Sequence, residues 1–379
     1  MDFELNEEQR AFRDAAKAFA EDVFAPNAAE WDAGSIFPAD ELRQAAALGF
    51  AGIYCREAHG GSDLKRQDAT VIFEELSAGC TSTSAYISIH NMASWMIDRF
   101  GGAGVKEKYL PDLVTMDKIA SYCLTEPGSG SDAAALKTQA VRDGDHYVLN
   151  GTKQFISGGG VNDVYVTMVR TGEHKTKGIT CLVVDKDTPG VSFGAPEKKL
   201  GWNASPTAQV IFEDAKVPVE NRVGDEGEGF RFAMMGLDGG RLNIGACSLG
   251  GAQRCLDEAV KYTKERQQFD TPVADFQNTQ FMLADMATDL EAARALLYLA
   301  AAKVTDNAPD KSRFSAMAKR LATDNGSKVV NDALQLFGGY GYLKDYPIER
   351  YWRDLRVHSI LEGTNQVMRM IVGRDLLRQ

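Results

Sequence analysis

Near the end of the chain, residues 357–372 read VHSILEGTNQVMRMIV. Thr364 and Asn365 are both good N-caps, so a helix is expected to begin there and to run to the end of the chain. Its buried stripe is predicted from i, i+3, i+4 spacing to be Val367, Met370 and Ile371. Glu362 lies directly before this helix, on a turn that Gly363 makes flexible. Two interpretations fit: the carboxylate is a base that meets a substrate carbon, or an acid that only favours the helix dipole.

The composition is that of an ordinary globular protein. The chain has 379 residues and 44% hydrophobic content, which suffices for two or three domains. No apolar run reaches the roughly 18 to 20 residues that a membrane span requires, and the start of the chain is acidic where a signal or transit peptide would be basic. We therefore expect no membrane insertion. The expected location is cytoplasmic, or the mitochondrial matrix after removal of a leader in a eukaryote.

Charge and cysteine usage argue against several kinds of site. The formal net charge is −11, so a nucleic-acid partner is not expected, because phosphate binding needs clustered Lys and Arg. The six cysteines form no CxxC motif and no Cys/His cluster, and the five histidines are not paired at ligand spacing. This pattern predicts buried, reduced thiols and no metal site.

Helical periodicity runs through the first third of the chain. Apolar residues predict a helix from Asn6 to about Glu30, with Pro26 as its stop, and a short extended piece is expected at 52–54. Further helices are expected over residues 39–48, 67–78, 83–100 and 105–115. Residues 1–117 are therefore predicted to form an N-terminal α-helical domain.

The periodicity changes near Lys118. Short β-rich runs separated by Gly, Asp, Asn and Pro turns occur at 119–124, 147–149, 154–156, 164–169, 179–184 and 209–212. This pattern is typical of an antiparallel barrel or sandwich. We therefore expect residues 118–222 to form a middle antiparallel β-barrel domain.

Long helices are expected in the rest of the chain, residues 223–379. An apolar stripe from Phe230 to Ala259 predicts a helix of more than thirty residues. Further helices over about 276–305 and 312–336 join it and the C-terminal helix in a four-helix bundle that also packs between subunits. The predicted fold class is therefore α+β and multidomain.

Two polar features stand out against these patterns. On the long helix, Arg241 falls on the apolar stripe three residues after Asp238, so the two residues either form a structural pair or bind a ligand. The segment 122–133, YCLTEPGSGSDA, formally satisfies the dinucleotide motif G-x-G-x-x-A. A nicotinamide-dependent oxidoreductase is therefore one alternative, although strands rather than a helix are expected to follow. A Pro-Gly-Ser surface loop is the other.

Both stretches resemble the acyl-CoA dehydrogenases. Residues 360–369 resemble that family's catalytic segment, residues 122–133 resemble its flavin-binding signature, and the resemblance extends over essentially the whole chain in the same order. It implies bound FAD and a reaction in which Glu362 removes the α-proton of an acyl-CoA thioester while the β-hydrogen leaves as hydride to the flavin. A desolvated carboxylate suits this step because the α-proton is a weak acid.

The resemblance also assigns residues to the two ligands. Residues 153–158 resemble the second flavin segment, with Phe155 where many members have Trp. Residues 266–277 and 335–339 resemble the part of the flavin site that spans subunits, with Asp270 where Gly is usual. The implied FAD-binding residues are Tyr122, Leu124, Thr125, Gly130, Ser131, Phe155, Ile156, Ser157, Arg266, Gln268, Phe269, Gln277, Gln335, Leu336, Gly338, Gly339, Thr364, Asn365 and Gln366. The implied substrate-binding residues are Ser131, Asp238, Arg241 and Gly363.

Further details of the resemblance narrow the expected reaction. Gly240 stands where some relatives carry the catalytic glutamate, which favours Glu362 as the base. Residues 79–92, 201–207 and 338–346 resemble the members that act in valine catabolism, which implies oxidation of isobutyryl-CoA to methacrylyl-CoA. Short straight-chain acyl-CoAs and 2-methylbutyryl-CoA stay open as substrates, because one methylene changes discrimination by only about 1 to 3 kcal/mol.

The resemblance implies electron-transfer flavoprotein as the electron acceptor and a homotetramer as the assembly. Two alternative functions also fit the sequence. A flavin oxidase of the same fold, such as the nitroalkane-oxidising relatives, would react with oxygen. A non-enzymatic helical scaffold would use the same motifs only for packing and would bind no cofactor.

Overall fold

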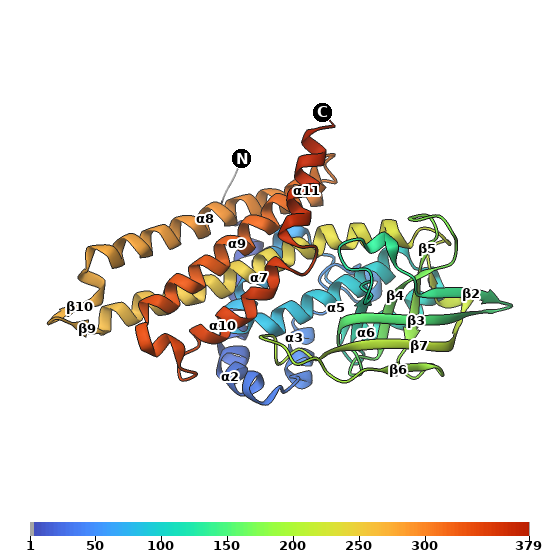
Figure 1. Ribbon diagram of the computed structural model, residues 1–379, viewed down its shortest axis with the longest axis horizontal. Helices are drawn as coiled ribbons and strands as arrows, with labels where there is room; N and C mark the ends of the chain where they lie inside the picture. Colours follow the sequence, from blue (N-terminus) through green and yellow to red (C-terminus); the bar gives the residue numbers. More distant parts are fainter. Residues whose placement is uncertain (1–3, 379) are drawn as a thin grey trace.

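The computed structural model describes residues 4–378. The first part is helical, the middle part is a β-sheet, and the last part consists of long helices that run beside the first (Figure 1). The sheet lies at one end of an elongated molecule, and the hairpin of β9 (Gln267–Gln268) and β10 (Thr271–Pro272) lies at the opposite end (Figure 1). This arrangement is the three-part α+β fold that the sequence predicts.

The N-terminal helices begin at a capping box. Asn6 and Gln9 each accept a hydrogen bond, through the side chain, from the backbone N–H of the other, so two helix N–H groups that would lack partners are bonded. The helices of this part are α1 (Glu7–Phe19), α2 (Ala25–Gly34), α3 (Ala39–Ala47), α4 (Arg66–Gly79), α5 (Thr81–Phe100) and α6 (Ala103–Val114).

Two details of this part differ from the sequence prediction. Pro26 does not stop the first helix, because a π-helical turn over Ala20–Phe24 leads into α2 and Pro26 lies in the first turn of α2. A proline is accommodated more readily in the first turn of a helix than in its interior. Residues 52–54 form turns instead of an extended piece, and the Ile53 N–H donates to the side chain of Asn91.

The middle part is one eight-stranded sheet in the order β6-β7-β3-β2-β4-β5-β8, with β1 beside β4. The strands are β1 (Ala120–Cys123), β2 (Gln139–Asp143), β3 (His146–Ser157), β4 (Val164–Arg170), β5 (Ile179–Asp185), β6 (Val191–Phe193), β7 (Thr207–Pro218) and β8 (Arg222–Val223). Most pairs are antiparallel, as predicted, but β1 and β2 each pair with β4 in parallel. The predicted runs at 147–149 and 154–156 belong to a single strand, β3, whose pairing with β7 is interrupted by bulges.

The C-terminal part is organised around one long helix. α7 (Gly229–Glu265) has 37 residues, which confirms the predicted length of more than thirty. It packs against α4 and α5 of the first part, so the two helical parts share one hydrophobic core. The remaining helices are α8 (Gln277–Thr305), α9 (Lys311–Leu336), α10 (Ile348–Leu355) and α11 (Asn365–Leu376). α7, α8 and α9 pack together and α11 lies on α9, which gives the predicted bundle.

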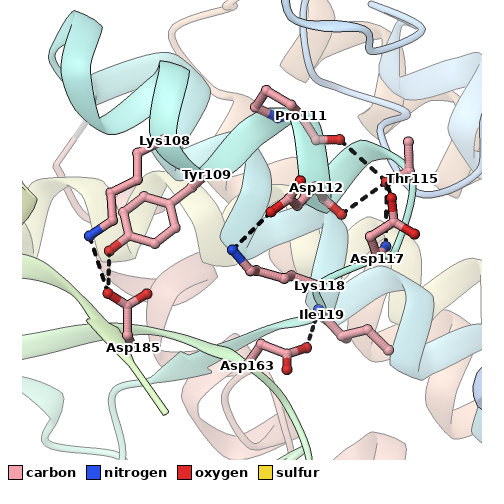
Figure 2. Close-up of polar contacts among 10 residues, drawn as sticks. All are labelled: Lys108, Tyr109, Pro111, Asp112, Thr115, Asp117, Lys118, Ile119, Asp163 and Asp185. Atoms are coloured by element: carbon pink, nitrogen blue, oxygen red, sulfur yellow. Dashed lines mark hydrogen bonds and ion pairs between the residues drawn. The ribbon is translucent and has the colours of Figure 1, made fainter. Parts of the chain in front are cut away.

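Polar contacts fix the sheet against the N-terminal helices. Figure 2 shows the end of α6 beside the strands: Tyr109 donates to Asp185 Oδ2 over 3.0 Å, and Lys108 Nζ lies 3.2 Å from the same oxygen. Nearby, the Asp163 carboxylate accepts from Ile119 N–H at 2.9 Å, directly before β1 (Figure 2). The bonds to Asp185 join α6 to the end of β5, and the Ile119–Asp163 bond fixes the residue before β1, the strand that leads to the candidate site.

Two predictions about composition can be compared with the fold. All six cysteines are buried and free, as predicted. Within residues 4–378, none of the helices is both long and apolar enough to cross a membrane.

Candidate active site

Glu362 lies on a tight turn between α10 and α11. Its φ is +56° and that of Gly363 is +89°, so two successive residues adopt the left-handed conformation that side chains disfavour. The turn ends at Thr364, whose side chain accepts a hydrogen bond from Val367 N–H at 3.2 Å. This confirms Thr364, one of the two predicted candidates, as the N-cap of the last helix.

The predicted buried stripe of that helix is wrong. Met370 is 42% exposed, and the buried residues of α11 are Asn365 and Met368. The physical reason is that Asn365 bonds to polar side chains of α9, and this contact turns the helix so that positions 365 and 368 face the core. A pattern of apolar residues cannot predict that an amide side chain such as that of Asn365 is buried.

Glu362 is half-buried, but one oxygen of its carboxylate is enclosed by the protein and lacks a hydrogen-bond partner. Its Oε2 atom contacts no donor within residues 4–378. Burial raises the pKa of Glu362 to about 7, and the nearby charges of Arg241 and Lys319 hold the pKa from rising further. A carboxylate with such a pKa and an unsatisfied oxygen is suited to accept a proton near neutral pH.

Helix α7 lies directly against this carboxylate. A Cβ atom at Gly240 would lie 2.8 Å from Glu362 Oε2 and 2.9 Å from its Cδ atom, closer than van der Waals contact allows. Glycine at 240 therefore makes room for the Glu362 side chain. A side chain at position 240 would therefore displace the Glu362 carboxylate from where it lies.

The pair Asp238 and Arg241 lies beside the turn. Arg241 Nη1 is 2.6 Å from Asp238 Oδ1, and Ser312 Oγ donates to the other Asp238 oxygen at 2.5 Å. Arg241 Nε donates to the backbone carbonyl of Glu362 at 3.2 Å. Both side chains are buried, so within this chain the pair holds the Glu362 turn against α7.

Sequence reasoning missed a second cation at the turn. Lys319 on α9 is fully buried and donates to the Gly363 carbonyl and to Asn365 Oδ1, each at 2.9 Å. A signal was available, because Lys319 falls within the buried stripe of α9 between Ala316 and Ala322, as Arg241 falls within the stripe of α7. Asn365, assigned to the cofactor by resemblance, uses its side chain for contacts inside the fold.

Tyr122 of strand β1 lies near Glu362. Its hydroxyl is buried and has no hydrogen-bond partner within the described part of the chain. Burial raises the pKa of Tyr122 well above its usual value, and the negative charge of Glu362 raises it further. The phenol and the carboxylate are therefore neighbours, and strand β1 and the turn before α11 meet at one place.

The two flavin-like segments are held together in the sheet. Gln154 N–H donates to the Thr125 carbonyl at 2.8 Å, and Lys153 Nζ lies 2.8 Å from Glu126 Oε1 in a buried ion pair. Phe155 lies within the irregular part of the β3–β7 pairing, has φ +56° and is 64% exposed. An aromatic ring with this much free surface is available for stacking on a planar ligand.

The glycine turn in this region is not of the dinucleotide type. It follows β1, but a single 3-10 turn over Ala133–Ala135 and then strand β2 come after it, where the motif requires an α-helix. A Cβ atom at Gly128 or Gly130 would meet nothing within 4 Å, so the backbone there is open to a ligand. Ser131, Ser157 and Gln366, which the resemblance also assigns to ligands, are exposed or half-buried at this end of the bundle and sheet.

The remaining flavin-like residues lie elsewhere. A cavity of ≈ 400 Å³ at the far end of α7 and α9 is lined by Arg266, Gln268, Gln335, Leu336, Gly338 and Gly339. Phe269, at the tip of the β9–β10 hairpin, is 91% exposed, and Gln277 begins α8 beside it. Figure 1 shows this hairpin and the sheet at opposite ends of the molecule. The structure therefore divides the predicted flavin residues into two groups, one beside the sheet and one near the β9–β10 hairpin at the opposite end of the molecule.

Comparison with known proteins decides what this arrangement is. Family models of the acyl-CoA dehydrogenase N-terminal, middle and C-terminal domains match residues 6–117, 121–215 and 227–377. The chain belongs to the acyl-CoA dehydrogenase family. Two relatives are similar along nearly the whole chain: the mitochondrial isobutyryl-CoA dehydrogenase of Dictyostelium discoideum is 57% identical over 98% of this chain and 90% of the relative, and that of Bos taurus is 55% identical over 99% and 90%. Among solved structures, the FAD complex of PigA is 31% identical with a TM-score of 0.96, and the match covers 100% of both chains.

Membership confirms the predicted family, fold and cofactor class. Acyl-CoA dehydrogenases are flavin-dependent oxidoreductases that use FAD, and acyl-CoA dehydrogenation is the activity of this chain. The geometry fits a flavin, because the Tyr122 hydroxyl is unpartnered, the backbone at Gly128 and Gly130 is open and the Phe155 ring is exposed. The nicotinamide and scaffold alternatives are therefore wrong for this acyl-CoA dehydrogenase.

Proposed function

We propose that this protein oxidises isobutyryl-CoA to methacrylyl-CoA. Support for this substrate comes from the relatives of 57% and 55% identity, which are named as isobutyryl-CoA dehydrogenases and match nearly the whole chain. Such identity over the full length exceeds what the shared fold alone requires. We also propose the domain division 1–117, 118–222 and 223–379, which follows the change from helices to sheet and back to helices.

In this proposal, Glu362 takes the α-proton of the thioester. The observation that carries the proposal is the buried Glu362 Oε2 atom, which has no donor within residues 4–378 and lies against the open backbone of Gly240. A desolvated carboxylate is a stronger base than one in water, and a free oxygen lone pair can point at the α-carbon. FAD, when bound, supplies the acceptor for the β-hydrogen.

The thioester carbonyl needs donors that stabilise the charge that develops when the α-proton leaves. In this chain the backbone N–H groups of Glu362 and Gly363 donate to no acceptor within residues 4–378, whereas the carbonyls of the same two residues are bonded to Arg241 and Lys319. We infer that the Glu362 N–H donates to the thioester oxygen. Asp238 and Arg241 contribute by fixing that N–H, and Ser131 and Gly363 line the thioester path.

We propose that the second half of each flavin site comes from another copy of the chain. Three of the predicted flavin residues, Arg266, Gln335 and Gly338, line a cavity at the far end of α7 and α9. Tyr122 and Phe155 belong to strands β1 and β3 of the sheet, which lies at the opposite end of the molecule (Figure 1). Arg266 suits a diphosphate because a guanidinium can bind it through two hydrogen bonds. A homotetramer, as the family resemblance implies, would bring this cavity of one copy to the sheet of another.

Two further parts of the proposal rest on resemblance alone. Electron-transfer flavoprotein is the proposed electron acceptor. The proposed location is the cytoplasm of a bacterium, or the mitochondrial matrix in a eukaryote; the relatives from Dictyostelium discoideum and Bos taurus are named as mitochondrial.

The substrate is tested by anaerobic titration of the purified FAD-loaded protein with isobutyryl-CoA, butyryl-CoA and 2-methylbutyryl-CoA. Absorbance of the oxidised flavin is followed. The expected result is fastest bleaching by isobutyryl-CoA. Faster bleaching by either of the other thioesters would keep the reaction and overturn the substrate.

A further inference from the structure

Lys319 occupies an unusual position for a lysine. It is fully buried in α9, and no carboxylate of residues 4–378 accepts a hydrogen bond from its ammonium group. Burying an ammonium without a directly bonded carboxylate is costly, and the pKa of Lys319 is lowered to about 8 by this burial. A lysine that is buried at this cost in free energy is expected to have a role that an apolar side chain could not perform.

The contacts of Lys319 lie on both sides of the base. Its Nζ atom donates to the carbonyl of Gly363, the residue after Glu362, and to Asn365 Oδ1 at the start of α11. The Asn365 amide in turn donates to Thr323 and Asp324 of α9, at 2.9 and 2.7 Å. The start of α11 is therefore tied to α9 through the polar bonds of Asn365 with Lys319, Thr323 and Asp324.

The turn needs such a restraint. Glu362 and Gly363 both have positive φ, a conformation that a non-glycine residue adopts at a cost and keeps only where the surroundings hold it there. Arg241 bonds the carbonyl of Glu362 and Lys319 bonds the carbonyl of Gly363, so two cations hold consecutive peptide groups. Neither cation bonds the carboxylate, and this leaves Oε2 free.

We propose that Lys319 is a positioning residue for α-proton removal: its ammonium holds the Gly363 carbonyl and thereby fixes the turn that aims the Glu362 carboxylate. This inference rests on the proposed role of Glu362 as the base and adds a residue that the sequence reasoning did not assign. The Lys319 charge also favours the ionised form of Glu362 across the turn.

Other charged groups face Lys319 and also affect how the rate of flavin reduction depends on pH. They are Glu362 on the turn, Arg241 on α7, and Asp324 on α9. His358, before the turn, is hydrogen-bonded to Ser248. Its burial, together with the Lys319 charge, lowers its pKa to about 3, so it stays neutral at neutral pH. Tyr122 on β1 and the Asp238 partner of Arg241 complete the surroundings.

The test compares Lys319→Met, which removes both donor and charge, with Lys319→Gln, which keeps a donor without the charge. Both are measured as FAD-loaded enzymes, by the rate of flavin reduction with isobutyryl-CoA across neutral pH. Lys328→Met is the matched control, because Lys328 lies on the same helix but pairs with Asp289 and Asp332 at the surface.

We expect Lys319→Met to lower the limiting rate by about 10- to 100-fold with little change in thioester affinity, since a misplaced base costs rate more than binding. Hydrogen exchange of the amides in residues 360–366 should be faster than in the native enzyme. Lys319→Gln should recover much of the rate but need a higher pH for it, because the charge that favours the carboxylate is gone.

A native rate and pH profile in Lys319→Met would overturn the inference. If that variant does not fold, a native rate together with a native pH profile in Lys319→Gln would overturn it equally, because neither would then depend on the ammonium group. Glu362→Gln is measured in parallel: rapid reduction in Glu362→Gln would mean that the proposed base is wrong, whereas an inactive Glu362→Gln beside a native Lys319→Met would remove only the role of Lys319.

Discussion

At Gly240, the absence of one carbon atom sets the position of the base. An alanine there would place its Cβ 2.8 Å from Glu362 Oε2, so the carboxylate, which is the free end of a flexible side chain, would move aside. We predict that Gly240→Ala lowers the rate of substrate-driven flavin reduction by on the order of 10²-fold. Stability should not fall, because alanine is favoured over glycine inside a helix by up to about 1 kcal/mol.

Stopped-flow reduction and thermal melting of Gly240→Ala check both parts of this prediction. Gly373→Ala on α11 is the control, since a Cβ atom there meets nothing within 4 Å. A native rate in Gly240→Ala would show that the carboxylate does not depend on this gap.

The pKa of Glu362, about 7, predicts how rate depends on pH. Only the ionised carboxylate accepts a proton, so the rate of flavin reduction should rise with pH through about 7. Single-turnover reduction measured over a pH series checks this. A rate that is independent of pH through this range would argue against Glu362 as the titrating base.

The raised pKa of Glu362 also makes stability depend on pH, but stability should fall as pH rises, whereas the rate should increase. The folded-state pKa of Glu362 lies above the unfolded value of about 4.3, so between these values the folded state binds more protons and its stability falls as pH rises. Replacement by glutamine removes this loss. We predict that Glu362→Gln melts at a higher temperature than the native protein above pH 7, and that the difference shrinks under acidic conditions.

The residues of the site could be predicted from sequence only in part. Glu362 and Arg241 stand out because a charged side chain interrupts a turn or an apolar stripe. Lys319 and Asn365 bond to each other across two helices, and their pairing appears only when α9 and α11 are packed. Phe155, an ordinary core residue by its type, is exposed because a bulge in β3 redirects it.

At the scale of elements, Arg353 of α10 joins segments far apart in the chain. Its guanidinium lies 2.6 Å from Asp32 Oδ2 on α2 and 2.7 Å from Glu349 Oε2 on α10, and all three side chains are largely buried. Removing one partner leaves buried charge unpaired, so Arg353→Met should cost about 3 to 5 kcal/mol of unfolding free energy. Arg43→Met, which breaks the exposed pair with Asp40, should cost less than about 1 kcal/mol.

Chemical denaturation of the two variants measures these costs. Equal losses in Arg353→Met and Arg43→Met would mean that the α2–α10 contact contributes no more than a surface pair.

Elements with strong periodicity were predictable, and weakly patterned ones were not. The long helix α7 follows from its apolar stripe. Strands β2, β6 and β8 are short or largely exposed and have no run of apolar residues, so only their pairing within the sheet defines them. The predicted helix end at Pro26 was wrong because a proline can occupy the first turn of a new helix as well as end a preceding one.

At the scale of the whole molecule, the separation of the flavin-like residues supports our proposal that each flavin site is shared between copies. Arg266 lines the cavity beside the β9–β10 hairpin, whereas Glu362 lies against Gly240 and near Tyr122 of β1. Figure 1 shows that hairpin and the sheet at opposite ends of the molecule. We predict that mixed oligomers of Glu362→Gln and Arg266→Ala chains recover flavin reduction that each variant alone lacks. In a mixed pair, one site combines an intact Glu362 from one copy with an intact Arg266 from the other.

Co-expression of the two variants with different tags, followed by purification on both, isolates these mixed oligomers. Their rate of flavin reduction is compared with that of each variant purified alone. Mixed oligomers no more active than the single variants would place both residues in one chain's site.

The central claim is that Glu362 removes the α-proton, and the most direct measurement is anaerobic mixing of FAD-loaded Glu362→Gln with isobutyryl-CoA. Glutamine keeps the size of the side chain but cannot accept the proton. We predict that the variant stays yellow and binds the thioester while the native protein bleaches. Rapid bleaching of Glu362→Gln would contradict the account and assign the base to another residue.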